Sequence, residues 1–256
     1  SSLSGSAGLK YIDPGPSEGA APRGRWRETR PDGTKHGITF ALRRAAAFAG
    51  VGEPAAYPMH ADPALPEETH ACGFALFVLG AAIADGKIGS LSDPVTRYIP
   101  ELKGSGYDGV TVEQLLTMTS GVAWNEDYTD PSSDVVRLFS DPVPAGVDPT
   151  VAYMRQLKRE YAPGQKWEYK TGETNLIGVL VRRATGERLS DYAKRKIVDP
   201  AGFAGDLFWQ IDTGGGNTGG CCIMLRLSDY ARMGLFALEG GKGQVPADWF
   251  AKAGTS

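Results

Sequence analysis

Tyr169 and Thr171 are the residues of this chain whose types and positions could do chemistry. A tight Ala-Pro-Gly turn at residues 162–164 precedes them, and an apolar helix is predicted directly after them. Proline fixes its own φ and glycine tolerates positive φ, so this turn is sharply defined. The pattern places a phenol and a hydroxyl in a loop before a helix, and Thr171 or Thr174 could cap the helix. Such a setting suits a tyrosine that takes part in acyl-transfer chemistry.

The helix that positions these hydroxyls is predicted over residues 173–185. Its apolar positions include Leu176, Ile177 and Leu180, and Gly186 is predicted as its C-terminal cap. Capping residues and apolar periodicity predict further helices at about 68–86, 111–118, 132–139, 148–159, 188–197 and 226–239. Asp148 or Thr150 is expected to start the helix at 148–159.

Other segments surround the tyrosine motif in a recognisable order. They are GAAIADGK at 80–87, LSDPV at 91–95, YIPEL at 98–102 and LLTMTSGV at 115–122. Together they resemble the class C β-lactamase and penicillin-binding-protein superfamily, nearest its esterase and nylon-oligomer (6-aminohexanoate-dimer) hydrolase branch. The resemblance implies an α+β, β-lactamase/transpeptidase-like fold in which a helical domain dominates. It also implies serine-hydrolase-type acyl transfer, which would hydrolyse a small ester, amide or lactam.

The family's chemistry needs a serine, a lysine one helical turn later and a distant tyrosine that acts as base. By the match, Tyr169 is that base and Thr171 takes the small polar position two residues on. The chain contains no Ser-x-x-Lys. Counting back from Gly80, the serine position falls on Thr69 and the lysine position on Cys72. A threonine hydroxyl can act as a nucleophile, but a cysteine cannot supply the cation that lowers a tyrosine pKa.

Cys72 could instead be the nucleophile, because His70 lies close by in the sequence. Residues two apart on a helix face different directions, however, so His70 is not placed to serve Cys72. A cysteine in an apolar run is usually a small buried hydrophobe. The sequence therefore favours packing over catalysis for Cys72.

The family's third motif is a Lys-Thr-Gly or His-x-Gly on a strand near the C-terminus. Residues 170–172 spell Lys-Thr-Gly, but they lie inside the tyrosine motif and ahead of a helix. We discount this match and expect the third motif and the family's C-terminal strands beyond Ser256.

Three segments are expected along the chain. Residues 1–67 are an atypical Gly/Pro/Ala-rich segment, 68–210 a helical catalytic domain, and 211–256 a Gly-rich cleft loop and a helix. The family would place two strands in the first segment, but only residues 37–42 read as a short strand, or as the start of a helix through 43–48. An incomplete or altered antiparallel sheet is therefore expected, as in a truncated, frameshifted or fused gene product.

A substrate-binding loop is predicted at residues 124–131. The loop resembles one of the nylon-oligomer branch whose tyrosine, at the place of Tyr128, closes over the amide substrate. Aromatic rings such as those of Trp124 and Tyr128 on a mobile loop suit a lid. Packing of both rings on the domain's own surface is the alternative. Gly215, in the loop 212–220, is expected to line the same cleft, because glycines permit close backbone approach.

Composition and charge exclude several classes of function. The formal net charge of −3 provides no basic surface for nucleic acid and no polybasic face for membranes. Asp127, Asp130 and Asp134 could attract a hard cation, but capping of a helix near Ser132 and Ser133 is favoured. We predict no metal and no cofactor.

The chain has three cysteines, of which Cys221 and Cys222 are neighbours. They form neither a disulfide framework nor a zinc pattern, which argues for a reducing compartment or an unpaired set. A cytoplasmic location is thus favoured over a periplasmic or secreted one. Two functions remain open: a serine-hydrolase relative, and a non-catalytic homologue that acts at most as a binding module.

Overall fold

The structure, a computed structural model, describes residues 67–69 and 72–254. The predictions for residues 37–48, for the family's N-terminal pair of strands and for His70 lie outside the described residues.

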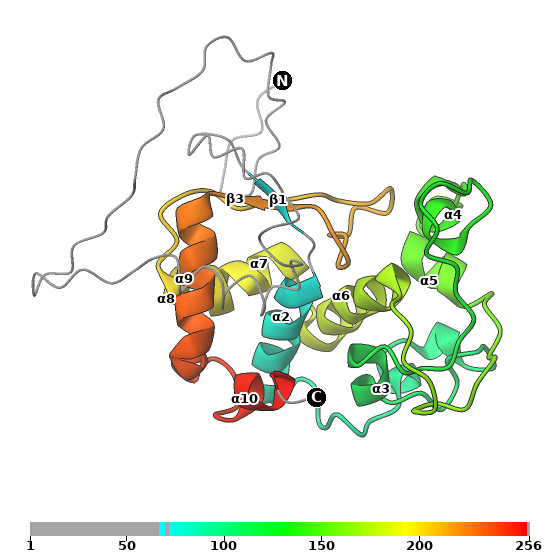
Figure 1. Cartoon of the computed structure of the whole chain (residues 1–256), viewed down its shortest axis with the longest axis horizontal. Helices are drawn as coiled ribbons and strands as arrows, with labels where there is room; N and C mark the ends of the chain where they lie inside the picture. The colour runs from blue at the N-terminus through cyan, green and yellow to red at the C-terminus, as the bar shows by residue number, and fades with distance from the viewer. Residues whose placement is uncertain (1–66, 70–71, 255–256) are drawn as a thin grey trace, which may run out of the picture.

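The centre of the molecule is a pair of packed helices, α2 (Cys72–Ala84) and α6 (Thr171–Thr185). Figure 1 shows α2 between α6 and α9 (Leu227–Leu238), with the small sheet above one end of the helices. Every residue of α6 from 171 to 181 is buried. Residues 176–181 of α6 are apolar or glycine on every side, so this part of the helix has to lie inside the fold.

Three short antiparallel strands form the sheet, in the order β1–β3–β2. They are β1 (Glu67–Thr69), β3 (Ile223–Leu225) and β2 (Phe208–Trp209). In the register, Thr69 faces Ile223, and so does Trp209 from the other side. The prediction of a helix from residue 68 was therefore wrong at its start, because the backbone of 67–69 pairs with β3 and α2 begins at Cys72.

Most predicted helices are confirmed, although the one predicted from residue 148 is shorter than expected. They are α3 (Val112–Leu116), α4 (Asp134–Ser140), α5 (Pro149–Met154), α6, α7 (Leu189–Ala193) and α9. A π-helical turn (Lys194–Val198) joins α7 to α8 (Asp199–Ala201), and α10 (Trp249–Ala253) is a further helix that was not predicted. Short 3-10 turns lie at Val95–Arg97, Pro100–Leu102 and Gly240–Gly243.

Local capping explains why several of these helices could be predicted. Thr111 and Gln114 form a reciprocal capping box, and the Asp148 carboxylate accepts from the Val151 N–H at 3.0 Å. Gly186 ends α6 with a φ of 74°. The prediction that the helix from 148 runs to 159 was wrong, because residues 158–161 leave it to lie beside 121–123 through backbone hydrogen bonds.

Aromatic rings join the first and the last of the described helices in the core. Phe77 contacts Phe236 and Phe250, with ring centroids 5.9 and 4.8 Å apart. The Trp249 indole N–H donates to the Leu76 carbonyl at 3.0 Å, and its ring covers Gly80 so closely that a Cβ there would lie 2.5 Å away. The result is an α+β fold in which helices dominate, as the sequence predicted. Among the described helices, none has the length and hydropathy needed to cross a bilayer.

Candidate functional site

The loop at residues 118–121 holds the segment that leads to Tyr169. The Gly164 N–H donates to the Thr119 carbonyl at 2.7 Å, and the Glu168 N–H donates to the Met118 carbonyl at 3.1 Å. At Gly121 a Cβ would lie 2.2 Å from the Tyr161 carbonyl oxygen, so only glycine fits there. Two motifs that lie far apart in the sequence thus form one backbone unit.

Tyr169 is half-buried at the end of this unit, immediately before α6. Its neighbour Lys170 is buried, and the Lys170 ammonium lies 3.0 Å from the Glu168 carboxylate. Lys170 is the N-cap residue of α6, and Thr171 and Gly172 begin the helix. This confirms that Lys170-Thr171-Gly172 is not a strand motif.

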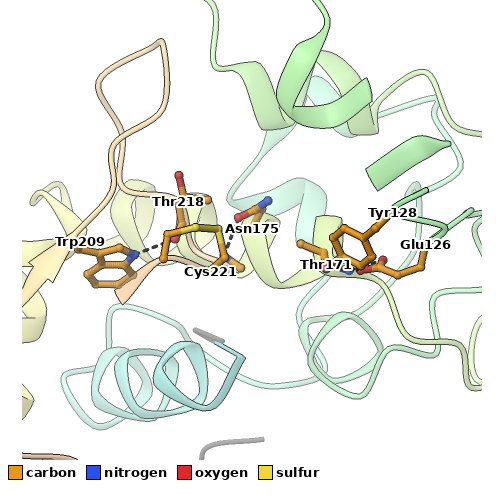
Figure 2. The surroundings of a disulfide bond; sticks show 9 residues. Glu126, Tyr128, Thr171, Asn175, Trp209, Thr218 and Cys221 are labelled. Carbon is orange, nitrogen blue, oxygen red and sulfur yellow. Dashed lines mark hydrogen bonds between the residues drawn. A yellow bond between two sulfur atoms is a disulfide. The ribbon is translucent and has the colours of Figure 1, made fainter. Parts of the chain in front are cut away.

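Three of the predicted substrate-binding side chains meet, and they meet on Glu126. One carboxylate oxygen, Oε1, accepts from the Tyr128 hydroxyl at 2.7 Å and from the Thr171 hydroxyl. The other, Oε2, accepts from the Thr171 N–H at 3.0 Å and from the Trp124 indole N–H. Figure 2 shows Glu126, Tyr128 and Thr171 gathered in this way. The structure therefore assembles a polar cluster of Trp124, Glu126, Tyr128 and Thr171, which we call the Glu126 cluster.

Glu126 itself was missed by the sequence reasoning. A carboxylate offers about four lone-pair sites, and here four donors fill them. The only signal in the sequence was the position of Glu126 between two aromatic residues that were themselves singled out.

Of the two residues expected to cap α6, Thr171 and Thr174, Thr171 does not do so. The Thr171 hydroxyl donates to Glu126 instead of accepting from the helix. Glu126 also accepts from the Thr171 N–H, which has no partner within the helix. A carboxylate at a helix N-terminus is stabilised by the unsatisfied N–H groups and by the helix dipole. The cap of α6 thus comes from a loop that is distant in sequence.

The two aromatic rings of the cluster differ in exposure. Trp124 is half-buried, packs against Gly172 and meets the Tyr153 ring edge-on at 6.5 Å between centroids. The Tyr128 ring is 61% exposed, while its hydroxyl lies 3.1 Å from that of Thr171. Trp124 therefore packs on the domain's own surface, whereas Tyr128 lies exposed at the start of α6.

Beneath the cluster, Glu173 occupies a fully buried position on the first turn of α6. Its Oε1 accepts from the Ser120 hydroxyl and, at 3.3 Å, from the Tyr107 hydroxyl. Its Oε2 has no hydrogen-bond partner among the described residues. Burial raises the pKa of Glu173 to about 7, although both hydrogen bonds and the nearby Lys170 charge act in the opposite direction.

The Gly-rich loop divides between two places. Gly215 is the tip of a turn, with its N–H donating to the Asp212 carbonyl at 3.0 Å and a φ of 80°. The neighbouring glycines line a pocket of about 450 Å³ at the far end of α6, together with Glu101, Asp148, Arg155, Arg182, Arg183 and Asp212. Gly219 and Gly220, in contrast, pack against the backbone carbonyl groups of Thr174 and Thr171, near the Glu126 cluster. Gly215 is thus placed beside the pocket, and the end of its loop lies beside the cluster.

The acidic loop is held by local contacts. Asp127 accepts from the Thr129 hydroxyl at 2.7 Å, and Asp130 from the Ser132 hydroxyl at 2.7 Å. Asp134 accepts from the Tyr153 hydroxyl at 2.7 Å. In the part of the chain that the structure describes, no group of three or more His, Cys, Asp or Glu residues could hold a metal ion.

The residues matched to the nucleophile and its lysine lie on different elements. Thr69 is the last residue of β1, and Cys72 is the first residue of α2. The pairing of Thr69 with Ile223 places its backbone at the end of the segment that runs through Gly219 and Gly220.

The expectation of unpaired cysteines was wrong. Cys221 and Cys222, which are adjacent in the chain, are joined by a disulfide bond. Spacing arguments look for cysteines that close a loop, and this bond closes none.

Comparison with known proteins gives a consistent result. The family model "Beta-lactamase" matches residues 74–210. A 6-aminohexanoate-dimer hydrolase of Paenarthrobacter ureafaciens is 34% identical over 185 residues, which cover 64% of this chain and 43% of that protein.

Two solved structures share the fold. A Bacillus anthracis protein described as a candidate 6-aminohexanoate-dimer hydrolase superposes with a TM-score of 0.65 at 20% identity, covering 78% of this chain and 55% of that one. An octameric penicillin-binding protein homologue from Pyrococcus abyssi superposes with a TM-score of 0.57 at 20% identity. The match covers 73% of this chain and 47% of that one. The chain thus spans about half the length of these relatives or less.

Proposed function

Because the chain belongs to the beta-lactamase family, we propose that it is a hydrolase that cleaves a small carboxylic ester, amide or lactam by acyl transfer. The observation that carries this proposal is the Glu126 cluster, which lies at the start of α6 two residues after Tyr169. Polar groups beside an exposed aromatic ring are what a small acyl substrate needs for orientation and cover.

In the proposed reaction, Tyr169 accepts the proton of the attacking hydroxyl and later returns it to the leaving group. Thr69 is the proposed nucleophile, because it falls at the position of the family's serine. An acyl-enzyme would form when the Thr69 oxygen attacks the carbonyl carbon and the alcohol or amine leaves. Water would then hydrolyse this ester.

The Glu126 cluster is proposed to bind the substrate. Tyr128 would cover the bound acyl group with its exposed ring, and Thr171 would offer its hydroxyl to a polar atom of the substrate. Glu126 keeps both side chains in place and provides negative charge, which favours a substrate that carries an amine or another donor at that end. The 6-aminohexanoate-dimer hydrolase that is 34% identical over 185 residues supports an amide as the first substrate to test.

A binding module is the second candidate. The sequence feature that favours it is the absence of Ser-x-x-Lys in these 256 residues, with Cys72 at the lysine position. A cysteine at that position supplies no cation to lower the pKa of the tyrosine, and proton transfer from the nucleophile would then be slow. Such a protein would bind an ester or amide in the same place and release it unchanged.

Intact-mass spectrometry after incubation with a fluorophosphonate and, separately, with a β-lactam would distinguish the candidates. Acyl transfer predicts a covalent adduct on the parent chain that is lost in Tyr169→Phe and in Thr69→Ala. Tyr161→Phe is the matched control, since Tyr161 lies on the same segment and contacts Lys166. An unmodified, folded parent that binds a linear amide saturably in calorimetry would favour the binding module. If the folded parent shows neither an adduct nor binding, both candidate functions are overturned.

A further inference from the structure

The disulfide between Cys221 and Cys222 lies beside the Glu126 cluster without belonging to it (Figure 2). Both cysteines are half-exposed, and they separate Gly220 from strand β3. None of the proposed steps of hydrolysis uses this bond.

The segment before the disulfide is tied to α6 and to the sheet. The Trp209 indole N–H donates to the Thr218 carbonyl at 2.7 Å, and the Gly220 N–H donates to the Asn175 side-chain oxygen at 2.5 Å. Both bonds are buried and appear in Figure 2. Residues 218–222, which we call the disulfide segment, are therefore held at a fixed position on α6.

This position adjoins the Glu126 cluster. A Cβ on Gly220 would lie 2.8 Å from the Thr171 carbonyl oxygen, and one on Gly219 would lie 2.8 Å from that of Thr174. Thr171 is the residue that gives both its N–H and its hydroxyl to Glu126. Any shift of the disulfide segment would thus change the packing of the turn that carries the cluster.

The backbone at the disulfide has an unusual conformation. Cys222 has a φ of 72°, in the left-handed region that residues other than glycine rarely adopt. Its carbonyl accepts from the Gln210 N–H at 3.1 Å. A covalent link between adjacent side chains restricts the peptide unit between them, so loss of the link would let Cys222 return to a negative φ and carry Gly220 away from Asn175.

We propose that Cys221–Cys222 is a redox modification site whose reduction by a dithiol, either a small molecule or a dithiol protein, releases the disulfide segment from α6. A thiolate of the dithiol attacks one sulfur and forms a mixed disulfide, and its second thiol displaces the chain. The S–S bond of the chain breaks, two S–H groups form on it, and the dithiol leaves as a disulfide. Two electrons and two protons are transferred. This proposal does not depend on the proposed hydrolysis.

The test counts thiols in the folded protein. In a Cys72→Ser background, which leaves these two cysteines alone, iodoacetamide followed by intact-mass spectrometry is expected to add no alkyl group before treatment with dithiothreitol and two after it. Two groups before treatment would show that the bond does not form. No groups after treatment would show that a dithiol cannot reach it. Either result would overturn the proposal.

Amide hydrogen exchange and tryptophan emission then test the release itself. Reduction is expected to accelerate exchange of the Gly220 amide by about ten-fold or more, since its hydrogen bond to Asn175 opens more often. It is also expected to change the tryptophan emission, with the change lost in Trp209→Phe. The double variant Cys221→Ser, Cys222→Ser is the control, and dithiothreitol should leave its exchange unchanged. Unaltered exchange and emission in a fully reduced parent chain would contradict the release.

Discussion

Glu126 accepts both the backbone N–H and the hydroxyl of Thr171, a residue 45 positions further along the chain. This double contact joins the loop after the 115–122 motif to the first residue of α6. It fixes the hydroxyl of Tyr128 at the same point, with an O–O distance of 2.7 Å to Glu126.

Replacement of Glu126 by glutamine is expected to destabilise the protein although the two side chains have the same shape. In one orientation the amide NH2 of glutamine would face the Trp124 and Thr171 N–H groups, and in the other it would face the Tyr128 and Thr171 hydroxyls, which now donate and would have to turn to accept. The loss is expected to be about 1–3 kcal/mol, the cost of leaving a partly buried donor unpaired. Urea unfolding measures it, with the exposed Glu113→Gln as the control. Equal losses in the two variants would contradict the role given to Glu126.

Tyr128→Phe is expected to leave the fold intact and to loosen the loop. The variant keeps the aromatic ring but removes the hydroxyl that contacts Glu126 and Thr171. Stability should fall by about 1 kcal/mol or less, since the ring is exposed. Amide exchange should become faster at residues 125–130 and stay unchanged in Tyr161→Phe. If Tyr128 contributes nothing to the loop, both variants will exchange at the parent rate.

Gly178→Ala is expected to destabilise the protein, although alanine is usually preferred over glycine within a helix. A Cβ at Gly178 would lie 2.9 Å from the Gly219 Cα, so the disulfide segment would have to move. Overpacking of this kind costs about 1–3 kcal/mol, whereas alanine in an unobstructed helix gains about 1 kcal/mol over glycine. The sign of the change in the unfolding free energy therefore decides whether the backbones are in contact, and a more stable variant would exclude the contact.

Because Glu173 is buried, we expect the free energy of unfolding to depend on pH. Its pKa in the folded state is raised to about 7 from an ordinary value of 4.5, because the side chain is buried. The folded state therefore holds the proton more tightly than the unfolded state. The stabilisation is complete below the unfolded pKa and is lost as the pH rises through the folded one. Between the unfolded-state and folded-state pKa values, the free energy of unfolding is expected to fall by about 3 kcal/mol.

Glu173→Gln should remove this dependence. Unfolding free energies measured from pH 4.5 to pH 8 should fall with pH in the parent, and the slope should be smaller in the variant. The variant should gain stability relative to the parent as the pH rises. Glu113→Gln, at an exposed position, serves as the control and should keep the parent slope. Parallel curves for parent and Glu173→Gln would show that Glu173 does not titrate in this range.

Much of the helical framework could be predicted because its signals are local. The capping box at Thr111, the N-cap at Asp148 and the C-cap at Gly186 each involve residues within a few positions of one another. Where a distant partner intervenes, the prediction failed. Residues 67–69 pair with β3, and residues 158–161 lie beside 121–123, so neither segment continues its neighbouring helix.

The candidate site divides in the same way. Tyr169, Thr171, Trp124 and Tyr128 could be selected from the sequence, because their motifs resemble a family whose model also matches the chain. Glu126 could not be selected, because its role comes from donors on two separate segments. The Cys221–Cys222 bond was missed because loop-closing arguments do not apply to neighbouring cysteines.

The sequence by itself determined the family, the tyrosine motif and the places where most helices begin and end, since these depend on residue types at short and fixed spacings. Only the tertiary structure decided that Glu126 gathers three of the predicted side chains, that Thr69 lies on a strand and that the disulfide segment rests on α6. These features depend on hydrogen bonds and close packing between segments that meet only after folding. No local pattern encodes such contacts.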